Sequence, residues 1–328
     1  MKTNQYTSVT SDKLVNLGDF SIAVILPCYN EEVAIAQTIS EFKAAIPEAT
    51  IHVFDNASSD KTIEIAIRAG AVVHKETYRG KGNVVRRMFS DVDADIYIMA
   101  DGDATYDAAK APEMVKHLIV NNLDMVNGAR KHTEIEAYRP GHQFGNWMLT
   151  ILVQIFFGKK FKDLLSGYRI FSRRFVKSFP AKSRGFEIET ELTVHALQLR
   201  MPTDEIQTAY RARPEDSISK LSTYSDGLRI LKMIGFLVKE ERPLAFFTSL
   251  ALVILIPSLF LFVSVLIEYF DTGAVARFPS LFVALSGFII SALSLVCALI
   301  LDTISRGRRE ARHLLYLQFN APQKPGTG

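Results

Sequence analysis

Short apolar runs alternate with amphipathic segments between residue 21 and about residue 128. The runs have the length of buried strands, and most are followed by a segment whose apolar residues recur at helical spacing. Strands are expected at "SIAVILP", "TIHVFD", "AVVHK", "DIYIMAD" and "LDMVNGA", with helices such as "EEVAIAQTISEFKAAI" between them. This alternation predicts an α/β fold, a parallel or mixed sheet with helices on both faces.

Two later stretches, residues 244–267 and 278–301, carry no charged side chain. Each is longer than the roughly 20 residues that a helix needs to cross a membrane, so we expect a transmembrane hairpin rather than two buried core helices. Basic residues flank the hairpin on both sides, whereas only Arg277 lies in its short connection. The positive-inside rule therefore places both ends of the hairpin, and the α/β region, in the cytoplasm.

Overall composition adds little to this picture. The formal net charge of +3 over 328 residues does not favour a nucleic-acid partner. The two cysteines, Cys28 and Cys297, lie in different predicted elements, so neither a disulfide framework nor a zinc cluster is expected. The N-terminal residues lack the apolar core of a signal peptide.

Polar motifs follow three of the predicted strands: "PCYNEE", "DNASSD" and "DGDATYD". Ligands of open α/β sheets bind beyond the carboxyl ends of the strands, so we expect these motifs to meet in one cleft. The third motif holds Asp101 and Asp103, two carboxylates that repel each other unless a positive charge lies nearby. A divalent cation, Mg²⁺ or Mn²⁺, shared with substrate phosphates would remove this repulsion. A solvated turn in which Asp107 caps a helix is the alternative.

Four motifs follow one another in the chain: "ILPCYNEE", "DNASSDKT", "RGKGNVVRRM" and "ADGDATY". In this order they resemble the GT-A glycosyltransferases of family 2, and within them the polyprenyl-phosphate group that includes the dolichol-phosphate mannose synthases. The resemblance covers roughly residues 20–240 and implies a Rossmann-like mixed sheet as the fold. The hairpin resembles the membrane anchor of bacterial members of the group.

The resemblance implies a nucleotide-sugar site at the strand ends. Asp55 would accept a hydrogen bond from the base, and Lys81 would reach a phosphate, with a helix cap and a simple glycine turn as the alternatives. Asp101 and Asp103 would hold the metal and serve as catalytic residues, together with Asp163. The residues implied to bind the donor are Pro27, Tyr29, Asn30, Glu31, Asp55, Lys81 and Asp101.

Two later segments resemble parts of the same group: "KDLLSGYRIF" resembles the segment after the acceptor-side helix, and "RARPEDSISK" resembles the basic loop that closes over phosphates. A third segment, "ARKHTEIEAYRPGHQFGN", places Arg130 and Arg139 before a predicted helix, which suits an anionic lipid headgroup. The side chains expected to bind the acceptor phosphate are Arg130, Arg139, Arg169, Arg213, Ser217 and Lys220. A fourth segment, "GFEIETEL", places Glu187 and Glu191 on one helix face and Glu189 on another. A solvated acidic face is the alternative interpretation of these glutamates.

The implied reaction is an inverting transfer of a sugar from a nucleotide sugar to undecaprenyl phosphate. The product would be a lipid-linked sugar donor for cell-surface glycan modification, and UDP is favoured as the nucleotide only by analogy with bacterial relatives. A phosphate monoester needs no general base, because it is mostly dianionic at neutral pH. Asp163 is the candidate to orient the acceptor or to act as a base.

These expectations divide the chain into five parts in a bacterial inner membrane, with the catalytic domain and both termini cytoplasmic. They are an N-terminal extension (1–20), a GT-A catalytic domain (21–222), a juxtamembrane amphipathic helix (223–243), the transmembrane hairpin (244–301) and a basic tail (302–328). Loops and helices of the acceptor side are expected between residues 130 and 242. A homo-oligomer formed through the hairpin is left open.

Three other functions compete with this interpretation. A processive polysaccharide synthase would carry a Gln-x-x-Arg-Trp motif, but the only tryptophan, Trp147, stands in "GNWMLT". A non-catalytic membrane partner is disfavoured by the intact Asp55, Asp101 and Asp103. A transferase with a hydroxyl acceptor stays open, as do the identities of the sugar, the nucleotide and the metal.

Overall fold

The computed structural model describes residues 15–132, 161, 163–185, 187–213, 232, 235, 236 and 238–322. Its contacts divide the chain into two units, residues 227–314 and all the rest. Three of the predicted acceptor residues, Arg139, Ser217 and Lys220, lie outside the described residues, as does most of the predicted juxtamembrane helix.

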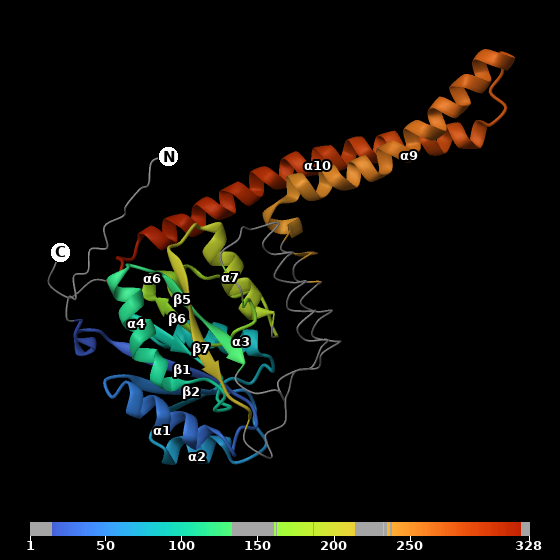
Figure 1. Ribbon diagram of the computed structural model, residues 1–328. Coiled ribbons are helices and arrows are strands. Elements are labelled where there is room, and N and C mark those ends of the chain that lie inside the picture. The colour runs from blue at the N-terminus through green and yellow to red at the C-terminus, as the bar shows by residue number, and fades with distance from the viewer. Residues whose placement is uncertain are drawn as a thin grey trace. The chain divides into compact units, whose positions relative to one another are not determined.

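The larger unit is built on a seven-stranded mixed sheet with the strand order β3-β2-β1-β4-β6-β5-β7 (Figure 1). Its strands are β1 (Ile22–Cys28), β2 (Thr50–Asp55), β3 (Val72–Lys75), β4 (Ile96–Met99), β5 (Met125–His132), β6 (Arg169–Ser172) and β7 (Thr203–Tyr210). The first four strands are mutually parallel, β6 is antiparallel to β4 and β5, and β7 is parallel to β5. The five predicted strands are confirmed, whereas β6 and β7 lie where the sequence predicts only loops and helices.

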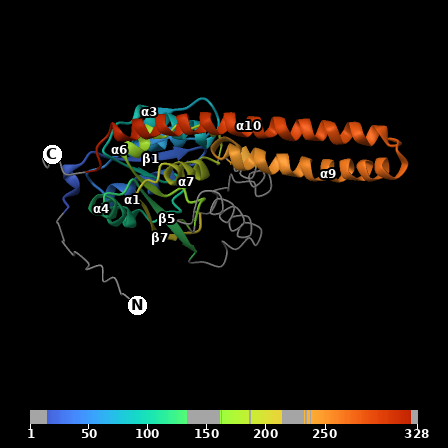
Figure 2. The ribbon, with the colours of Figure 1, turned by 90° about the horizontal axis from the view of Figure 1, so that it is seen from above.

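Helices cover both faces of this sheet, as the view from above shows (Figure 2). One face carries α1 (Ile35–Ala45), α2 (Thr62–Arg68) and α4 (Ala111–Val120), whose buried residues join one apolar cluster with the sheet. The other face carries α3 (Lys81–Asp91), α6 (Arg173–Ser178) and α7 (Ile188–Gln198), with α3 in contact with both of its neighbours. Two short 3₁₀ helices, η1 (Leu17–Asp19) and η2 (Ala108–Lys110), complete the described helices of this unit's α/β region.

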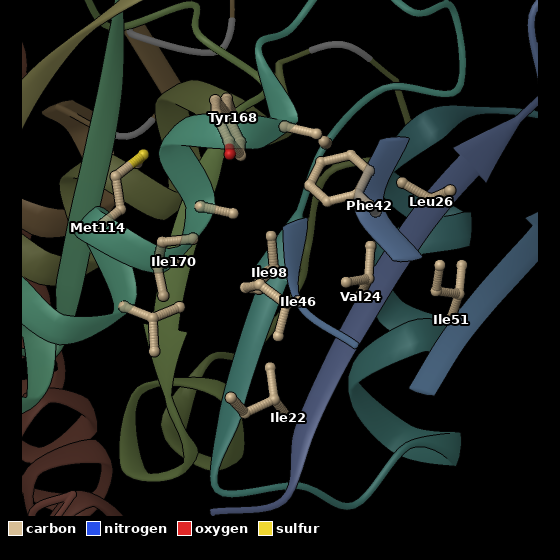
Figure 3. Packing of buried hydrophobic residues seen from close by; sticks show 14 of the residues in the cluster. Ile22, Val24, Leu26, Phe42, Ile46, Ile51, Ile98, Met114, Tyr168 and Ile170 are labelled. Carbon is tan, nitrogen blue, oxygen red and sulfur yellow. The ribbon is translucent and has the colours of Figure 1, made fainter. Parts of the chain in front are cut away.

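The core explains why β1 and its neighbours form a firm base for the site. Val24 and Leu26 are two positions apart on β1, so both side chains point from the same face of the strand into the cluster beside Phe42 of α1 (Figure 3). Ile98 of β4 and Ile170 of β6 extend the same layer across the sheet. All five side chains are at most 1% exposed, and close-packed interiors of this kind hold the strand ends, and the polar residues that follow them, in place.

The smaller unit contains α9 (Pro243–Thr272) and most of α10 (Phe278–Leu317). Their most apolar 18-residue windows have mean hydropathies of 3.0 and 2.5, yet only 17% and 22% of these windows is buried within the protein. A core helix of a water-soluble protein would bury such a surface. Both helices are therefore candidate membrane spans, and Pro257 lies inside α9 without ending it, as membrane helices tolerate.

Buried residues at seven-residue spacing line the contact between the two long helices. They are Ala251, Ser258 and Val265 on α9, and Ala284, Ser291, Ala298 and Ser305 on α10. The Ser291 hydroxyl donates to the Ala251 carbonyl at 3.0 Å, and a Cβ atom added at Gly287 would lie 1.8 Å from the Ser258 Oγ. Close approach of small residues and interhelical hydrogen bonds are what holds helices together in lipid.

The C-terminal end of α10 belongs to the larger unit, where it completes a buried polar cluster. The carboxylate of Asp124 is fully buried and accepts hydrogen bonds from the hydroxyls of Ser172 and Tyr316, both at 2.7 Å. Arg174 donates to both oxygens of Asp124, and its guanidinium stacks 4.7 Å from the centre of the Tyr316 ring. Helical structure thus continues through much of the predicted basic tail, and the larger unit is discontinuous in sequence.

We expect Tyr316→Phe to lower the free energy of unfolding of the larger unit by about 2 kcal/mol, because it removes a hydrogen bond to a buried carboxylate and keeps the ring on Arg174. Thermal or urea unfolding of the purified protein in detergent measures the loss. The control is Tyr78→Phe, which removes a hydroxyl from a side chain that is 75% exposed. Equal stability of the two variants would show that the Tyr316 hydroxyl does not stabilise the unit.

Candidate functional site

A cavity of about 260 Å³ lies beyond the carboxyl ends of β1, β2 and β4. All three strand-end motifs contribute to its lining, which confirms the expectation that they meet in one cleft. The polar and charged side chains of the lining are those of Tyr29, Glu31, Asn56, Arg79, Lys81, Asp101, Asp103, Tyr106, Arg130, Glu189, Tyr210 and Arg213. The site therefore combines carboxylates with several basic groups.

The loops that follow β1, β2 and β4 each contain a non-glycine residue in the left-handed region. Asn30, Ala57 and Ala104 have φ angles of 51°, 59° and 56°. Such backbone persists where the surroundings fix it, and it is frequent at functional sites. Here the Asn30 amide N–H donates to the Ser58 hydroxyl at 2.9 Å, and the Ala104 amide N–H donates to the Thr38 hydroxyl at 3.1 Å. The loops are thus held in place by hydrogen bonds between neighbouring segments.

Two basic side chains of the protein neutralise the aspartate pair. The Lys81 ammonium lies 2.5 Å from Asp101 Oδ1, and the Arg213 guanidinium lies 2.6 Å from Asp103 Oδ2. Burial and the neighbouring Asp101 raise the pKa of Asp103, and the charge of Arg213 offsets part of this rise. The Thr105 hydroxyl donates to Asp103 Oδ1 at 2.6 Å and fixes the orientation of the carboxylate.

The residue types at Asp101 and Asp103 suit a hard divalent cation. Their side chains are 29% and 2% exposed, and carboxylate oxygens are the ligands that Mg²⁺ and Mn²⁺ prefer. Among the described residues, no group of three or more His, Cys, Asp or Glu side chains has metal-binding geometry. A cation at this pair could also take oxygen ligands from substrate phosphates, as Mg²⁺ commonly does.

Lys81 lies between two carboxylates, those of Asp101 at 2.5 Å and Glu189 at 2.7 Å. Burial alone would lower the pKa of this lysine, but the two negative charges outweigh burial and raise it. The flanking glycines serve packing: Cβ atoms at Gly80 and Gly82 would lie 2.1 Å and 2.2 Å from the backbone oxygens of residues 184 and 183. Lys81 thus bridges two carboxylates at the cavity, and its contact with a phosphate stays a prediction.

The acidic segment at the start of α7 is buried rather than solvated, so the alternative of an exposed acidic face is wrong for Glu189 and Glu191, each 4% exposed. Glu191 accepts hydrogen bonds from the backbone N–H groups of Lys182 and Ser183 and from the Ser183 hydroxyl, at 2.5 to 2.9 Å. Burial raises the pKa of Glu189, an effect that the charge of Lys81 partly offsets. Helical spacing correctly placed Glu189 on a different helix face from Glu191. The position of Glu189 in the cavity lining was not predicted.

Asp163 and Arg130 form one buried pair. The Arg130 guanidinium donates to both carboxylate oxygens of Asp163, at 2.7 and 2.8 Å. Burial alone would raise the pKa of Asp163, but the hydrogen bonds and charge of Arg130 outweigh burial and lower it. Arg130 lines the cavity, whereas Asp163 does not.

Arg169 is placed differently from its predicted contact with the acceptor phosphate. Its side chain is fully buried and does not line the cavity. The guanidinium donates to the carbonyls of Leu164 and Ser166 at 2.7 and 2.9 Å and to the Thr193 hydroxyl at 2.8 Å. Burial lowers the pKa of Arg169 to about 10. These internal bonds occupy the guanidinium, so the predicted acceptor role of Arg169 is corrected to a structural one.

The residues predicted to contact the nucleoside lie at the β1 and β2 end of the site. Pro27, Tyr29 and Glu31 line the cavity, while the Asn30 side chain accepts a hydrogen bond from the Ser59 N–H at 2.8 Å. Asp55 is 2% exposed, and its Oδ2 accepts a hydrogen bond from the Ser58 N–H at 3.1 Å. No described residue donates to the other oxygen, Oδ1, which suits the predicted bond from a base.

Sequence reasoning missed two further groups in this part of the site. The Asn56 side chain donates to the carbonyls of Glu76 and Tyr78 and accepts from the Gly80 N–H at 2.6 Å, so it joins the loops after β2 and β3. The Arg79 guanidinium lies 5.3 Å from the centre of the Tyr29 ring. Asn56 and Arg79 both belong to motifs that the sequence analysis identified. Their contacts were not predicted, because the residues that they contact lie at least 20 positions away in the sequence.

Comparisons with known proteins agree with this architecture. The family model described as "Glycosyl transferase family 2" matches residues 23–179. Protein RfbJ of Shigella flexneri is 62% identical over 125 residues, which are 38% of this chain and 97% of that protein. Glycosyltransferase AglJ of Haloferax volcanii is 34% identical over 70% of this chain and 76% of its own. The undecaprenyl-phosphate mannosyltransferase of Micrococcus luteus is 23% identical over 61% of this chain and 87% of its own.

A solved structure shares the fold. Glucosyl-3-phosphoglycerate synthase from Mycobacterium tuberculosis, crystallised with Mn²⁺, UDP and glucosyl-3-phosphoglycerate, superposes with a TM-score of 0.55. The two chains are 21% identical, and the match covers 66% of this chain and 81% of that one. With its mixed sheet, its cavity at the strand ends and these relatives, the chain belongs to glycosyl transferase family 2 and has a GT-A fold.

Proposed function

We propose that this protein is a membrane-bound, metal-dependent glycosyltransferase that moves a sugar, with inversion, from a nucleotide sugar to polyprenyl phosphate. The observation that carries the proposal is the composition of the cavity, in which a carboxylate pair is surrounded by Lys81, Arg130 and Arg213. Carboxylates that hold a cation suit a diphosphate leaving group, and additional arginines suit a second phosphate. Similarity to an undecaprenyl-phosphate mannosyltransferase supports the same acceptor class.

The donor would lie along the ends of β1, β2 and β4. Pro27 and Tyr29 would contact the nucleoside, and Asp55 would accept a hydrogen bond from the base through Oδ1. A divalent cation bound by Asp101 and Asp103 would neutralise the charge that develops on the leaving diphosphate. We favour UDP because the related fold from Mycobacterium tuberculosis was crystallised with it.

The acceptor phosphate would meet Arg130 and Arg213, whose guanidinium groups can form two parallel hydrogen bonds to phosphate oxygens. Asp163 would be a positioning residue for Arg130. Its carboxylate is occupied and its pKa is lowered, so it is a poor base, and a dianionic phosphate needs none. Arg139, Ser217 and Lys220 keep their predicted acceptor role as part of this proposal.

The decisive experiment incubates the purified full-length protein with undecaprenyl phosphate and a panel of UDP- and GDP-sugars, and identifies lipid products by mass. We expect one nucleotide sugar to give a lipid with one added sugar phosphodiester. Reactions without lipid, and reactions with undecaprenol in place of its phosphate, are the controls. Transfer to the alcohol or to a soluble hydroxyl compound, with none to the phosphate, would overturn the proposal.

We also propose that α9 and α10 form a two-span anchor in a bacterial cytoplasmic membrane, with the catalytic unit in the cytoplasm. Single cysteines in place of Lys239, Arg277 and Arg308, in a background in which Cys297 is serine, test this orientation. We expect an impermeant maleimide to label position 277 in intact spheroplasts, and positions 239 and 308 only after permeabilisation. The reverse pattern would place the catalytic unit outside.

A further inference from the structure

We propose that Glu189 recognises the donor sugar, with its Oε2 atom accepting a hydrogen bond from a sugar hydroxyl. This inference rests on the proposed function only in requiring that a nucleotide sugar occupies the cavity. It does not depend on the chemical class of the acceptor.

The position of Glu189 relative to the aspartate pair fits a sugar contact. Glu189 lines the cavity, and its Oε1 atom lies 2.7 Å from the Lys81 ammonium. The same ammonium lies 2.5 Å from Asp101 Oδ1, so a single side chain separates Glu189 from the proposed diphosphate site. The donor sugar is bonded directly to the diphosphate. Its ring must therefore lie within a few ångströms of the phosphates, which is where Glu189 is found.

No other residue in the part of the chain that the structure describes donates a hydrogen bond to the second oxygen of Glu189. The residue is only 4% exposed, so water replaces that donor poorly. Leaving a buried charged acceptor unsatisfied is unfavourable, and a ligand that supplies a hydrogen-bond donor there gains binding free energy. A ligand without a donor at this point gains nothing from Oε2.

The chemistry of a nucleotide sugar leaves one kind of group for this contact. The diphosphate oxygens are negative, carry no hydrogen at neutral pH and would repel a carboxylate. A metal ion beside Glu189 is disfavoured, because the Lys81 ammonium already occupies the space between Glu189 and Asp101. Sugar hydroxyls, in contrast, are donors, and a site built to bind a hydroxyl rejects analogues that lack it.

Glu191 provides a matched control on the same helix. It is equally buried, but its two carboxylate oxygens accept hydrogen bonds from the N–H groups of Lys182 and Ser183 and from the Ser183 hydroxyl. Glu191 is also absent from the cavity lining. Replacement of Glu191 by glutamine should therefore affect folding and leave sugar recognition unchanged.

The test is calorimetry with the full-length protein in detergent, using UDP-glucose, UDP-galactose, UDP-N-acetylglucosamine and GDP-mannose, with UDP and GDP as references. For the sugar that the parent protein binds more tightly than its free diphosphate, we expect Glu189→Gln to reduce this advantage by about tenfold. The affinity for the free diphosphate should change by less than about twofold. Glu191→Gln should keep the full advantage of the sugar.

Monodeoxy analogues of the same nucleotide sugar identify the hydroxyl. We expect one analogue to bind the parent protein about tenfold more weakly than the complete sugar, and to show a much smaller loss with Glu189→Gln. Equal losses for diphosphate and nucleotide sugar would mean that Glu189 only positions Lys81. No loss in either, or no gain from any sugar in the parent protein, would also overturn the inference. Failure of transfer to polyprenyl phosphate would instead overturn the proposed function alone.

Discussion

The Asp103→Asn variant is expected to keep its fold and to lose sugar transfer by about a thousandfold, which corresponds to about 4 kcal/mol of transition-state stabilisation. The carboxylate is 2% exposed, and the amide keeps the shape of the side chain and the hydrogen bond from Thr105. What the variant loses is the negative charge, which pairs with Arg213 at 2.6 Å and would hold a cation at the diphosphate. Initial rates of transfer and the thermal unfolding temperature measure the two effects separately.

Two comparisons sharpen this prediction. Asp107→Asn changes a carboxylate in the same loop that caps the Ala109 N–H at 3.1 Å and lies 3.5 Å from the Arg211 guanidinium. Asp107 does not line the cavity, so transfer should stay within a few-fold of the parent. Excess chelator should abolish transfer by the parent protein, and added Mg²⁺ or Mn²⁺ should restore it. Full activity in chelator would remove the metal from the proposed mechanism.

Lys81→Met is expected to lower the free energy of unfolding by about 3–5 kcal/mol, because it breaks a buried ion pair and leaves the other charge without a partner. The lysine side chain is 8% exposed and is the shared partner of Asp101 and Glu189. Without it, Glu189 would face Asp101 as an uncompensated buried carboxylate. Urea or thermal unfolding of the purified variant gives the loss.

The double variant Lys81→Met with Glu189→Gln tests the physical reason for that loss. It removes the buried negative charge together with the positive one, so we expect most of the lost stability to return. The difference between the double variant and the sum of the single variants measures the coupling of the two groups. A double variant no more stable than Lys81→Met would mean that the loss arises from packing. Transfer activity should not return in either case.

The local hydrophobic pattern was sufficient to predict the first five strands and the two long apolar helices. Each of these elements has its pattern of apolar residues within one continuous segment of the chain. The local pattern was insufficient for β6 and β7. Strand β6 has only four residues and begins with Arg169, and β7 mixes polar residues with a half-buried surface. These strands are defined by their partners β4 and β5, and pairing between distant segments leaves little trace in either segment alone.

The site shows the same division. The motifs predicted which loops meet, because parallel strands bring their carboxyl ends to one edge of a sheet. The partners of individual charges were not predictable. Lys81 pairs with Glu189, which is more than a hundred residues away, and Arg169 is satisfied by backbone carbonyls that exist only in the folded chain. A charged residue in a motif indicates where a functional site lies. Only the fold shows which other charged group forms an ion pair with that residue.

The discontinuity of the larger unit has a consequence for how the protein is made. The ribosome synthesises Tyr316 after the whole of α9 and nearly all of α10, yet Tyr316 supplies one of the hydrogen bonds to Asp124 in the larger unit. The polar cluster around Asp124 therefore stays incomplete in the nascent chain until both apolar helices have been synthesised. A chain truncated before α9 therefore lacks part of the fold that carries the candidate site.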